Sequence, residues 1–163
     1  MLISKLLNAY TTYKVKFGSK VRFGSKVRFR KNVRIAISDT GRVVFGNGVF
    51  MNNDCSLTSR VSITIDDDTI IGEGVKFYDH NHRFNIKGKL IKNQGFSCQE
   101  IHIGKNCWIG SNVTILKGVT IGDNCVIGAG SVIRKSIPKD SLVYGEQKII
   151  TNKIKWRLDN EES

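Results

Sequence analysis

The chain has 163 residues, of which 40% are hydrophobic and 25% are charged, a balance typical of one folded domain and unlike that of a disordered segment. With 16 glycines and 1 proline, the composition excludes a collagen-like or proline-rich protein and indicates many tight turns. The formal net charge of +12 favours an anionic partner, such as nucleic acid, a membrane surface or a phosphate-bearing ligand.

The first residues do not have the pattern of a targeting segment. The apolar run at Met1–Asn8 is too short and too interrupted for a signal peptide, and no later run reaches the roughly 18 residues of a membrane span. We therefore expect a cytoplasmic protein, with residues 1–14 forming a short N-terminal cap. The four cysteines contain no C-x-x-C pair, and Cys107 and Cys125 are expected to be reduced and buried.

A period of six residues begins at Phe17. The hexapeptide Phe-Gly-Ser-Lys-Val-Arg occurs twice in succession over residues 17–28. In the second half, isoleucines stand six apart without a miss, at positions 103, 109, 115, 121, 127 and 133. Small or branched residues follow four places after the first five of them, at Cys107, Val113, Val119, Cys125 and Ser131. This period fits neither a helix nor a lone strand, and it predicts a solenoid of short strands whose coils bury their apolar sides against each other.

Two features interrupt the period. Between residues 45 and 77 the apolar register slips, which indicates local bulges or extra turn residues. Residues 78–100 contain no hexad and are polar, so they are expected to form a loop extruded from the solenoid, and long loops in compact domains are usually functional. The repeat ends after Pro138, and residues 150–163 are expected to form a C-terminal tail with apolar residues that cap the last coil.

The hexads resemble those of the hexapeptide-repeat acyltransferases, over residues 15–149. The resemblance implies an all-β fold, a left-handed parallel β-helix with an extruded loop and short terminal caps, in which three hexads make one triangular coil. The handedness follows from the resemblance alone, because general crossover rules favour the opposite hand. The resemblance also implies a homotrimer with a cleft for acetyl-CoA between two subunits, which suits the flat faces of a prism.

The extruded loop opens with the residues Asp79-His80-Asn81-His82. An imidazole can take a proton from a hydroxyl near neutral pH, and Asp79 or a loop carbonyl could orient it. From these residues alone, a catalytic base, two exposed loop histidines and part of a metal site all stay open. No other cluster has metal-ligand spacing, so no metal is expected, and His102 is expected on the surface.

The resemblance assigns roles in this loop. It implies that His80 is the general base that activates an acceptor hydroxyl for direct attack on acetyl-CoA, with His82 as the second candidate. Asp79 and His82 are expected to contact the acceptor, and so is Asn52, which matches the first Asn of an A-N-x-N-C stretch in the family.

Further motifs imply contacts to acetyl-CoA. The run from Cys107 to Ser111 resembles the family's W-I-G-S segment, in which the Trp lines the pantetheine channel and the Ser amide faces the oxyanion. Residues 127–131 resemble I-G-A-G-S, in which the Ala backbone contacts the CoA arm. Basic residues 134, 135 and 148 stand where family members contact phosphates, although Arg replaces Thr and the proline of the G-x-P-A-K tail is missing. The implied donor-side residues are Trp108, Gly110, Ser111, Ala129, Arg134, Lys135 and Lys148.

Residues 14–34 contain nine basic residues and no acid. A period of six moves each residue to the next face, so Lys16, Arg22 and Arg28 form a ring rather than a stripe. A ring lacks a base-reading element, so nucleic acid is not an expected partner. A solvated basic end and attraction to an anionic polysaccharide, a lipid-linked sugar or a membrane surface both stay open.

These observations favour an acetyl-CoA-dependent O-acetyltransferase acting on a sugar hydroxyl in surface-polysaccharide assembly. The first alternative is an N-acetyltransferase of a nucleotide-linked amino sugar, which would use the same base on an amine. The alternative from another class is a non-catalytic basic solenoid that binds polyanions.

Overall fold

The structure, a computed structural model, describes residues 18–145 and 154–155. Three parallel sheets form the faces of a prism, and the chain visits them in the order A, B, C in each coil. Face A comprises β1 (Val21–Phe23), β4 (Val43–Phe45), β7 (Ile63–Ile65), β12 (Ile101–Ile103) and β15 (Thr120–Ile121). Face B comprises β2 (Arg28–Phe29), β5 (Phe50–Met51), β8 (Ile70–Ile71), β13 (Trp108–Ile109), β16 (Val126–Ile127) and β18 (Leu142–Val143). Face C comprises β3 (Arg34–Ile37), β6 (Ser56–Ser59), β9 (Lys76–Tyr78), β14 (Thr114–Leu116) and β17 (Val132–Ile133).

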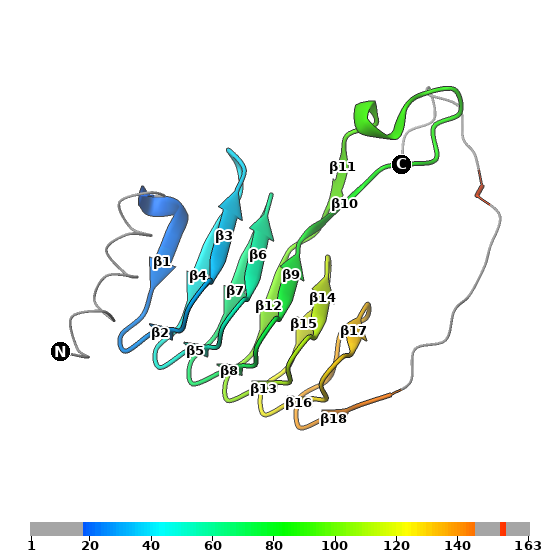
Figure 1. The fold of residues 1–163 in the computed structure, drawn as a ribbon. Helices are drawn as coiled ribbons and strands as arrows, with labels where there is room; N and C mark the ends of the chain where they lie inside the picture. The colour runs from blue at the N-terminus through cyan, green and yellow to red at the C-terminus, as the bar shows by residue number, and fades with distance from the viewer. Residues whose placement is uncertain (1–17, 146–153, 156–163) are drawn as a thin grey trace.

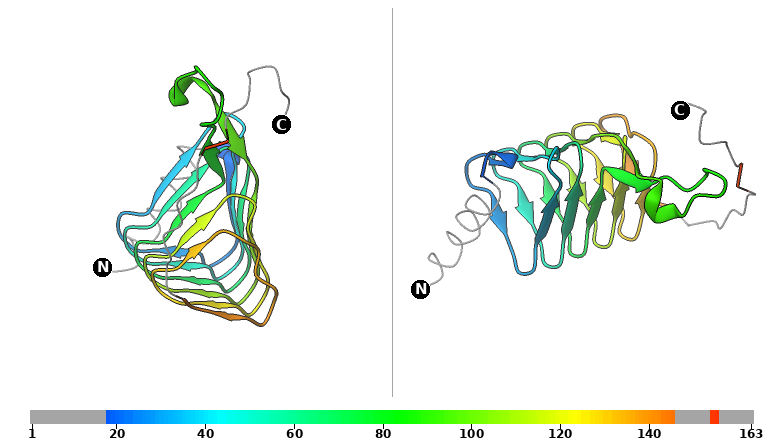
Figure 2. Two further views of the ribbon diagram at one scale, coloured as in Figure 1. Left: turned by 90° about the vertical axis from the view of Figure 1, so that its right-hand side faces the viewer. Right: turned by 90° about the horizontal axis from the view of Figure 1, so that it is seen from above.

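The coils stack along one axis with their strands side by side (Figure 1). Seen along that axis, each coil is a triangle, and one segment projects from a corner (Figure 2). This is a left-handed parallel β-helix, so the expected all-β solenoid is confirmed. The expected caps at residues 1–14 and in the tail lie outside the described residues, apart from residues 154–155.

The isoleucine column predicted from the period fills the interior. Ile103, Ile109, Ile115 and Ile121 are fully buried, and Ile127 is 1% exposed. The five small or branched residues of the second column are buried as well. Equivalent residues of neighbouring coils pair directly, for example Ile109 with Ile127, so each coil covers the apolar side of the next.

Extra residues enter the coils at one edge only, the CA edge, where the chain passes from face C to face A. Equivalent positions lie 22 residues apart in the first coils, 20 in the next, 18 after the excursion and 16 in the last coil. The steps from face A to face B and from face B to face C span six residues in every coil. The extra residues therefore fall between β3 and β4 and between β6 and β7. The excursion between β9 and β12 leaves from this same edge.

The excursion is a hairpin and not the irregular loop expected from its lack of hexads. Strand β10 (His80–His82) pairs antiparallel with β11 (Phe96–Cys98). The tip contains the 3-10 turn η2 (Ile91–Asn93), and a second short 3-10 turn, η1 (Gly18–Lys20), precedes β1. The buried Gln94 amide closes the tip, because it accepts from Ile86 N and donates to Lys89 O. Among the described residues no helix is long and apolar enough to cross a membrane.

Gly104, a glycine of the isoleucine hexads, is required by crowding and not by a left-handed backbone. A Cβ on Gly104 would lie 2.7 Å from Asp123 N and 2.8 Å from the Gly122 carbonyl carbon, both backbone atoms of the next coil. The left-handed conformation occurs two residues further on, at Asn106, whose φ is 51°. Asparagine tolerates that conformation better than most residues. Gly104 therefore meets the steric requirement of the turn, and Asn106 meets its conformational requirement.

We expect Gly104→Ala to destabilise the solenoid by about 1–3 kcal/mol, because a methyl group forces neighbouring coils apart. The measurement is the midpoint of urea unfolding followed by circular dichroism. Gly145→Ala is the matched control, since a Cβ at Gly145 meets no atom within 4 Å. Equal stability of the two variants would contradict this account of the turn.

Candidate functional site

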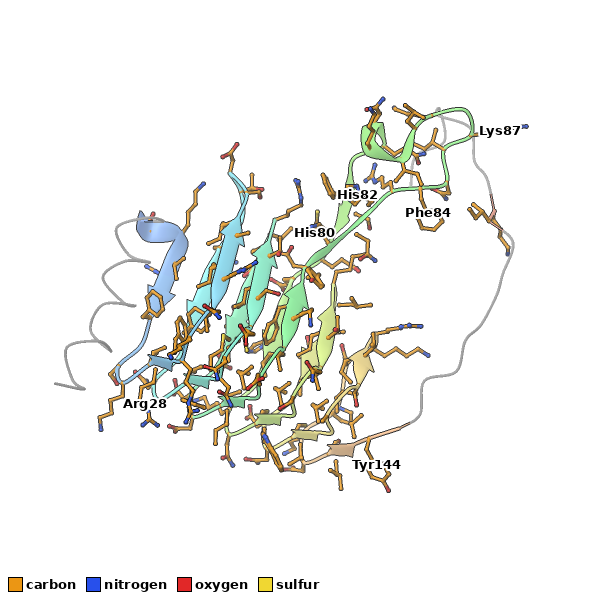
Figure 3. All side chains as sticks on the ribbon, in the orientation of Figure 1. Arg28, His80, His82, Phe84, Lys87 and Tyr144 are labelled. Atoms are coloured by element: carbon orange, nitrogen blue, oxygen red, sulfur yellow. The ribbon has the colours of Figure 1, made fainter. Side chains whose placement is uncertain are left out.

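The strongest chemical arrangement in the structure is an Asp–His pair at the CA edge. Asp79 follows β9, and His80 begins β10. The Nδ1 atom of His80 lies 3.1 Å from Asp79 Oδ1. The Asp79 side chain is fully buried, whereas 13% of the His80 side chain is exposed. The imidazole therefore connects a buried carboxylate to the surface. Figure 3 shows His80 and His82 along the segment that leaves the coils.

The Asp79 carboxylate is held by donors from the preceding coil. Ser59 Oγ donates to Oδ2 at 2.8 Å, and Val61 N–H donates to the same oxygen at 2.8 Å. The Arg60 N–H lies 2.8 Å from Oδ1 and 2.9 Å from Oδ2. A backbone N–H can only donate, so both oxygens act as acceptors. His80 Nδ1 is then the donor of its bond to Asp79, and Nε2 is left as the basic nitrogen.

An aromatic ring fixes the other side of the imidazole. The ring of Phe96 stands edge-to-face against His80 with 5.4 Å between ring centroids, and it contacts His82 at 4.4 Å. The guanidinium of Arg60 lies over the same Phe96 ring, 3.4 Å from its centroid. Stacking of a cation on a ring restrains both groups, so Arg60 and Phe96 form a wall beside His80.

The expected acceptor contact of Asp79 needs correction. Its side chain has no exposed surface and its oxygens are engaged by four donor groups, so it cannot touch an acceptor. Its position instead suits the other role considered for it, orientation of His80. His82 lies on the same face of β10 as His80, is exposed, and remains available to an acceptor.

A second group of expected site residues lies at the BC edge, where the chain passes from face B to face C. Asn52, Gly110 and Ala129 occupy this edge in different coils, and Ser111 follows Gly110. Trp108 lies next to them on face B with 57% of its surface exposed. The side-chain oxygen of Asn52 accepts from Asn53 N, so part of its hydrogen-bonding capacity is used within the turn.

The backbone N–H of Ser111 has no acceptor in the described part of the chain because of the residue at the same position in the next coil. In some other turns of the solenoid, a side-chain oxygen one coil further on takes this N–H: Asn53 Oδ1 accepts from Lys31 N at 3.1 Å on the same BC edge, and Asn47 Oδ1 accepts from Ser25 N at 2.9 Å between faces A and B. Above Ser111 the corresponding residue is Ala129, which has no side-chain acceptor. The Ser111 N–H has no partner among the described residues, so it can donate to an incoming oxyanion.

One chain does not bring the two edges together. Ser111 precedes β14 and His80 follows β9, and these strands pair in parallel on face C. The two residues therefore lie at opposite ends of that face, roughly 20 Å apart by the rise of extended chain. Arg134 and Lys135 follow β17 at the CA edge, both exposed, and Lys148 lies outside the described residues.

The remaining expectations concern metals and other histidines. Within the described residues no three or more His, Cys, Asp or Glu side chains are placed to hold a metal ion. His102 lies on the surface of face A, where its Nε2 is 2.8 Å from Asp66 Oδ2. This exposed histidine–carboxylate contact contrasts with the buried one at Asp79.

Comparison with known proteins agrees with this architecture. Residues 100–135 match the family described as bacterial transferase hexapeptide (six repeats). A protein of Staphylococcus aureus (strain COL), provisionally named an acetyltransferase, is 41% identical over 120 residues, which are 73% of this chain and 59% of that protein. A hexapeptide-repeat acetyltransferase of Vibrio cholerae, solved with acetyl coenzyme A, superposes with a TM-score of 0.74 at 29% identity, covering 91% of this chain and 78% of that one.

The repeat, the fold and these relatives are those of the hexapeptide-repeat acyltransferase superfamily. Another superfamily relative, from Escherichia coli (strain K12), is provisionally named a lipopolysaccharide biosynthesis O-acetyl transferase. It is 30% identical over 112 residues, which are 64% of this chain and 57% of that protein. The chain spans less than two thirds of the length of both curated relatives.

Sequence reasoning within the superfamily pattern missed Ser59, Arg60 and Phe96. Ser59 and Arg60 lie 20 and 19 residues before Asp79, which is one coil of the solenoid. A search for polar residues one coil before His80 would have found them. Phe96 faces His82 across the hairpin, and nothing in the hexad pattern indicates that pairing.

The cysteines differ in accessibility, with consequences for any thiol assay. Cys98 is exposed, whereas Cys55, Cys107 and Cys125 are buried. Burial raises the pKa of the Cys55 and Cys107 thiols, which lowers their thiolate fraction at a given pH. We expect a thiol reagent at pH 8 to modify Cys98 fast and these two slowly, with their rates still rising above pH 9. Mass spectrometry of the modified peptides measures this, and faster reaction at Cys107 than at Cys98 would contradict it.

Proposed function

We propose that the chain is an acetyl-CoA-dependent O-acetyltransferase that acetylates a sugar hydroxyl during surface-polysaccharide assembly. The observation that carries the proposal is the buried Asp79 carboxylate, which engages His80 Nδ1 and leaves Nε2 as the basic nitrogen of a partly exposed ring at the start of the excursion. The relatives support this choice, since one was solved with acetyl coenzyme A and another is provisionally named for O-acetyl transfer in lipopolysaccharide biosynthesis.

The proposed reaction is a direct transfer. His80 Nε2 removes the proton of the acceptor hydroxyl while that oxygen attacks the thioester carbonyl carbon of acetyl-CoA. The Ser111 N–H donates to the carbonyl oxygen as it becomes an oxyanion. The carbon–sulfur bond then breaks, and the CoA thiolate takes the proton from His80. The products are an acetyl ester and CoA thiol, and no covalent enzyme intermediate is required.

The reaction requires two chains if Ser111 and His80 act on one thioester. The two residues occupy opposite ends of face C, so the CA edge of one chain must meet the BC edge of the next. A contact between different edges is heterologous, and it closes into a ring when the rotation is three-fold. We therefore propose a homotrimer in which Trp108, Gly110 and Ala129 of one chain form the acetyl-CoA side of a cleft.

The test is the acceptor-dependent release of CoA thiol from acetyl-CoA. The protein carries Cys98→Ser so that the thiol reagent reports CoA and not the exposed cysteine. Release that requires a sugar and yields a base-labile product supports O-acetylation, whereas a base-stable product indicates an amide and overturns it. Tight polyanion binding without thiol release for any sugar or amino sugar indicates the non-catalytic solenoid.

The substitution Ala129→Asn tests the oxyanion role of Ser111. Its side-chain oxygen is expected to accept the free Ser111 N–H, as Asn47 accepts from Ser25 N. We expect unchanged or higher stability and a fall in kcat of about 10²-fold, because the oxyanion donor is then occupied. Steady-state kinetics and thermal unfolding measure the two effects.

The same variant examines the two-chain arrangement. Ala129→Asn and His80→Ala chains, refolded together, are expected to regain activity, because some clefts then combine a native CA edge with a native BC edge. No recovery in mixed oligomers would place both residues in one chain and contradict the proposed cleft. Unchanged kcat in Ala129→Asn alone would remove Ser111 from the mechanism.

A further inference from the structure

We propose that a basic groove on face A, close to the Asp79–His80 pair, binds a phosphate group of the acceptor. The groove is lined by Ser19, Lys20, Arg22, Arg42, Val44 and Thr64 and encloses about 370 Å³. That the phosphate belongs to an acceptor rests on the proposed function. Phosphate binding itself follows from the groove alone.

Two of the three cations of the groove have no acid beside them among the described residues. No carboxylate among the described residues lies within ion-pairing distance of Arg22 or Arg42. Lys20 donates to Ser38 O at 3.3 Å, and its nearest acid is the fully exposed Asp39 at 4.0 Å. Arg42 uses Nε for Ser62 Oγ at 3.1 Å, which fixes the side chain and leaves its terminal nitrogens for a ligand.

The chemistry of the lining suits a phosphate ester better than a carboxylate. Two guanidinium groups can each bind two oxygens of one anion, and an ammonium adds a point charge. The hydroxyls of Ser19 and Thr64 add donors on the same groove. Three cations with two hydroxyls match the charge and the several oxygens of a phosphate, whether in a sugar phosphate or in the diphosphate of a carrier-linked sugar.

The groove is connected to His80 through the CA edge. Ser59 Oγ lies 2.8 Å from Asp79 Oδ2 and 2.9 Å from the Arg42 carbonyl oxygen. Ser62, which holds the Arg42 guanidinium, follows Val61, whose N–H donates to Asp79. An acceptor with its hydroxyl at His80 can therefore extend over face A towards β1 and place a phosphate between Arg22 and Arg42.

The duplicated hexapeptide supplies a matched control. Its first copy contributes Lys20 and Arg22 to the groove, whereas the equivalent residues of the second copy lie elsewhere. Lys26 occupies a left-handed turn with φ of 57°, and Arg28 lies over the Phe50 ring on face B at 5.7 Å. Figure 3 shows Arg28 at the opposite end of its coil from the corner that carries His80. Both pairs have the same sequence context and charge.

The experiment compares Lys20→Gln/Arg22→Gln with Lys26→Gln/Arg28→Gln in the full chain without acetyl-CoA. Isothermal titration calorimetry measures the dissociation constants of glucose 1-phosphate, UDP-glucose, glucuronate and glucose. We expect the groove variant to bind glucose 1-phosphate or UDP-glucose about tenfold more weakly than the wild type, and the control variant to change less than twofold. The tighter of the two phosphates shows whether the groove takes a monoester or a diphosphate.

Several results would overturn the proposal. Equal weakening in both variants would show that net charge alone attracts the anion. Tighter binding of glucuronate than of both phosphates would make the groove a carboxylate site. A raised KM for acetyl-CoA with an unchanged acceptor KM would assign the groove to the donor, and binding only to phosphatidylglycerol vesicles would assign it to a membrane. Phosphate binding without acetyl transfer to any acceptor would contradict the proposed function but would still support the groove as a phosphate site.

Discussion

The variant His80→Ala is expected to transfer acetyl groups about 10³-fold more slowly than the wild type. A positioned general base contributes roughly 10²- to 10⁴-fold, and no second imidazole lies against the buried Asp79 carboxylate. Binding of acetyl-CoA and of the acceptor is expected to survive, because the role proposed for His80 is proton transfer. The measurement is kcat with acetyl-CoA and acceptor both saturating.

The other described histidines serve as controls. His82→Ala removes a ring that touches the same Phe96 but contacts no carboxylate among the described residues, so it is expected to raise the acceptor KM more than it lowers kcat. His102→Ala removes the exposed pair with Asp66 and is expected to leave both constants unchanged. Full activity in His80→Ala, with loss in His82→Ala, would assign the general base to His82, two residues further along β10.

The coil could be predicted from sequence because its environment repeats. Each isoleucine of the column meets the same neighbours one coil away, so a single local rule fixes many contacts, and the spacing of six exposes that rule. The ring-like placement of the basic residues follows from the same rule: Arg22, Arg28 and Arg34 lie on β1, β2 and β3, one on each face.

The surroundings of His80 could not be predicted in the same way. Ser59 and Arg60 reach Asp79 because the slip between β6 and β7 places extra residues at the CA edge, and a slip has no periodic signal for its shape. The hairpin pairing that brings Phe96 to His80 depends on a contact outside the coil. The candidate site thus lies where the six-residue repeat is interrupted. A residue within the repeat has the same surroundings as its equivalents in neighbouring coils, whereas a site needs surroundings of its own.

The variant Asp79→Asn is expected to remain folded and to lose about 10²-fold or more in kcat. The amide retains one accepting oxygen and gains two donors. Its oxygen is required by Ser59 Oγ and by the Arg60 and Val61 N–H groups, so its nitrogen faces His80 Nδ1. The amide then donates to Nδ1, the ring proton moves to Nε2, and His80 can no longer accept a proton from the acceptor.

A loss caused by unfolding can be separated from a loss caused by the wrong tautomer. Conflicting donors at a buried site cost about 1–3 kcal/mol, so kcat is measured well below the unfolding midpoint of the variant. Nitrogen NMR of the His80 ring shows directly which nitrogen carries the proton. Asp66→Asn is the matched control, since Asp66 holds His102 in an exposed pair of the same type at 2.8 Å, and its kcat is expected to equal that of the wild type. A folded Asp79→Asn protein with normal kcat would mean that the carboxylate has no part in orienting the base.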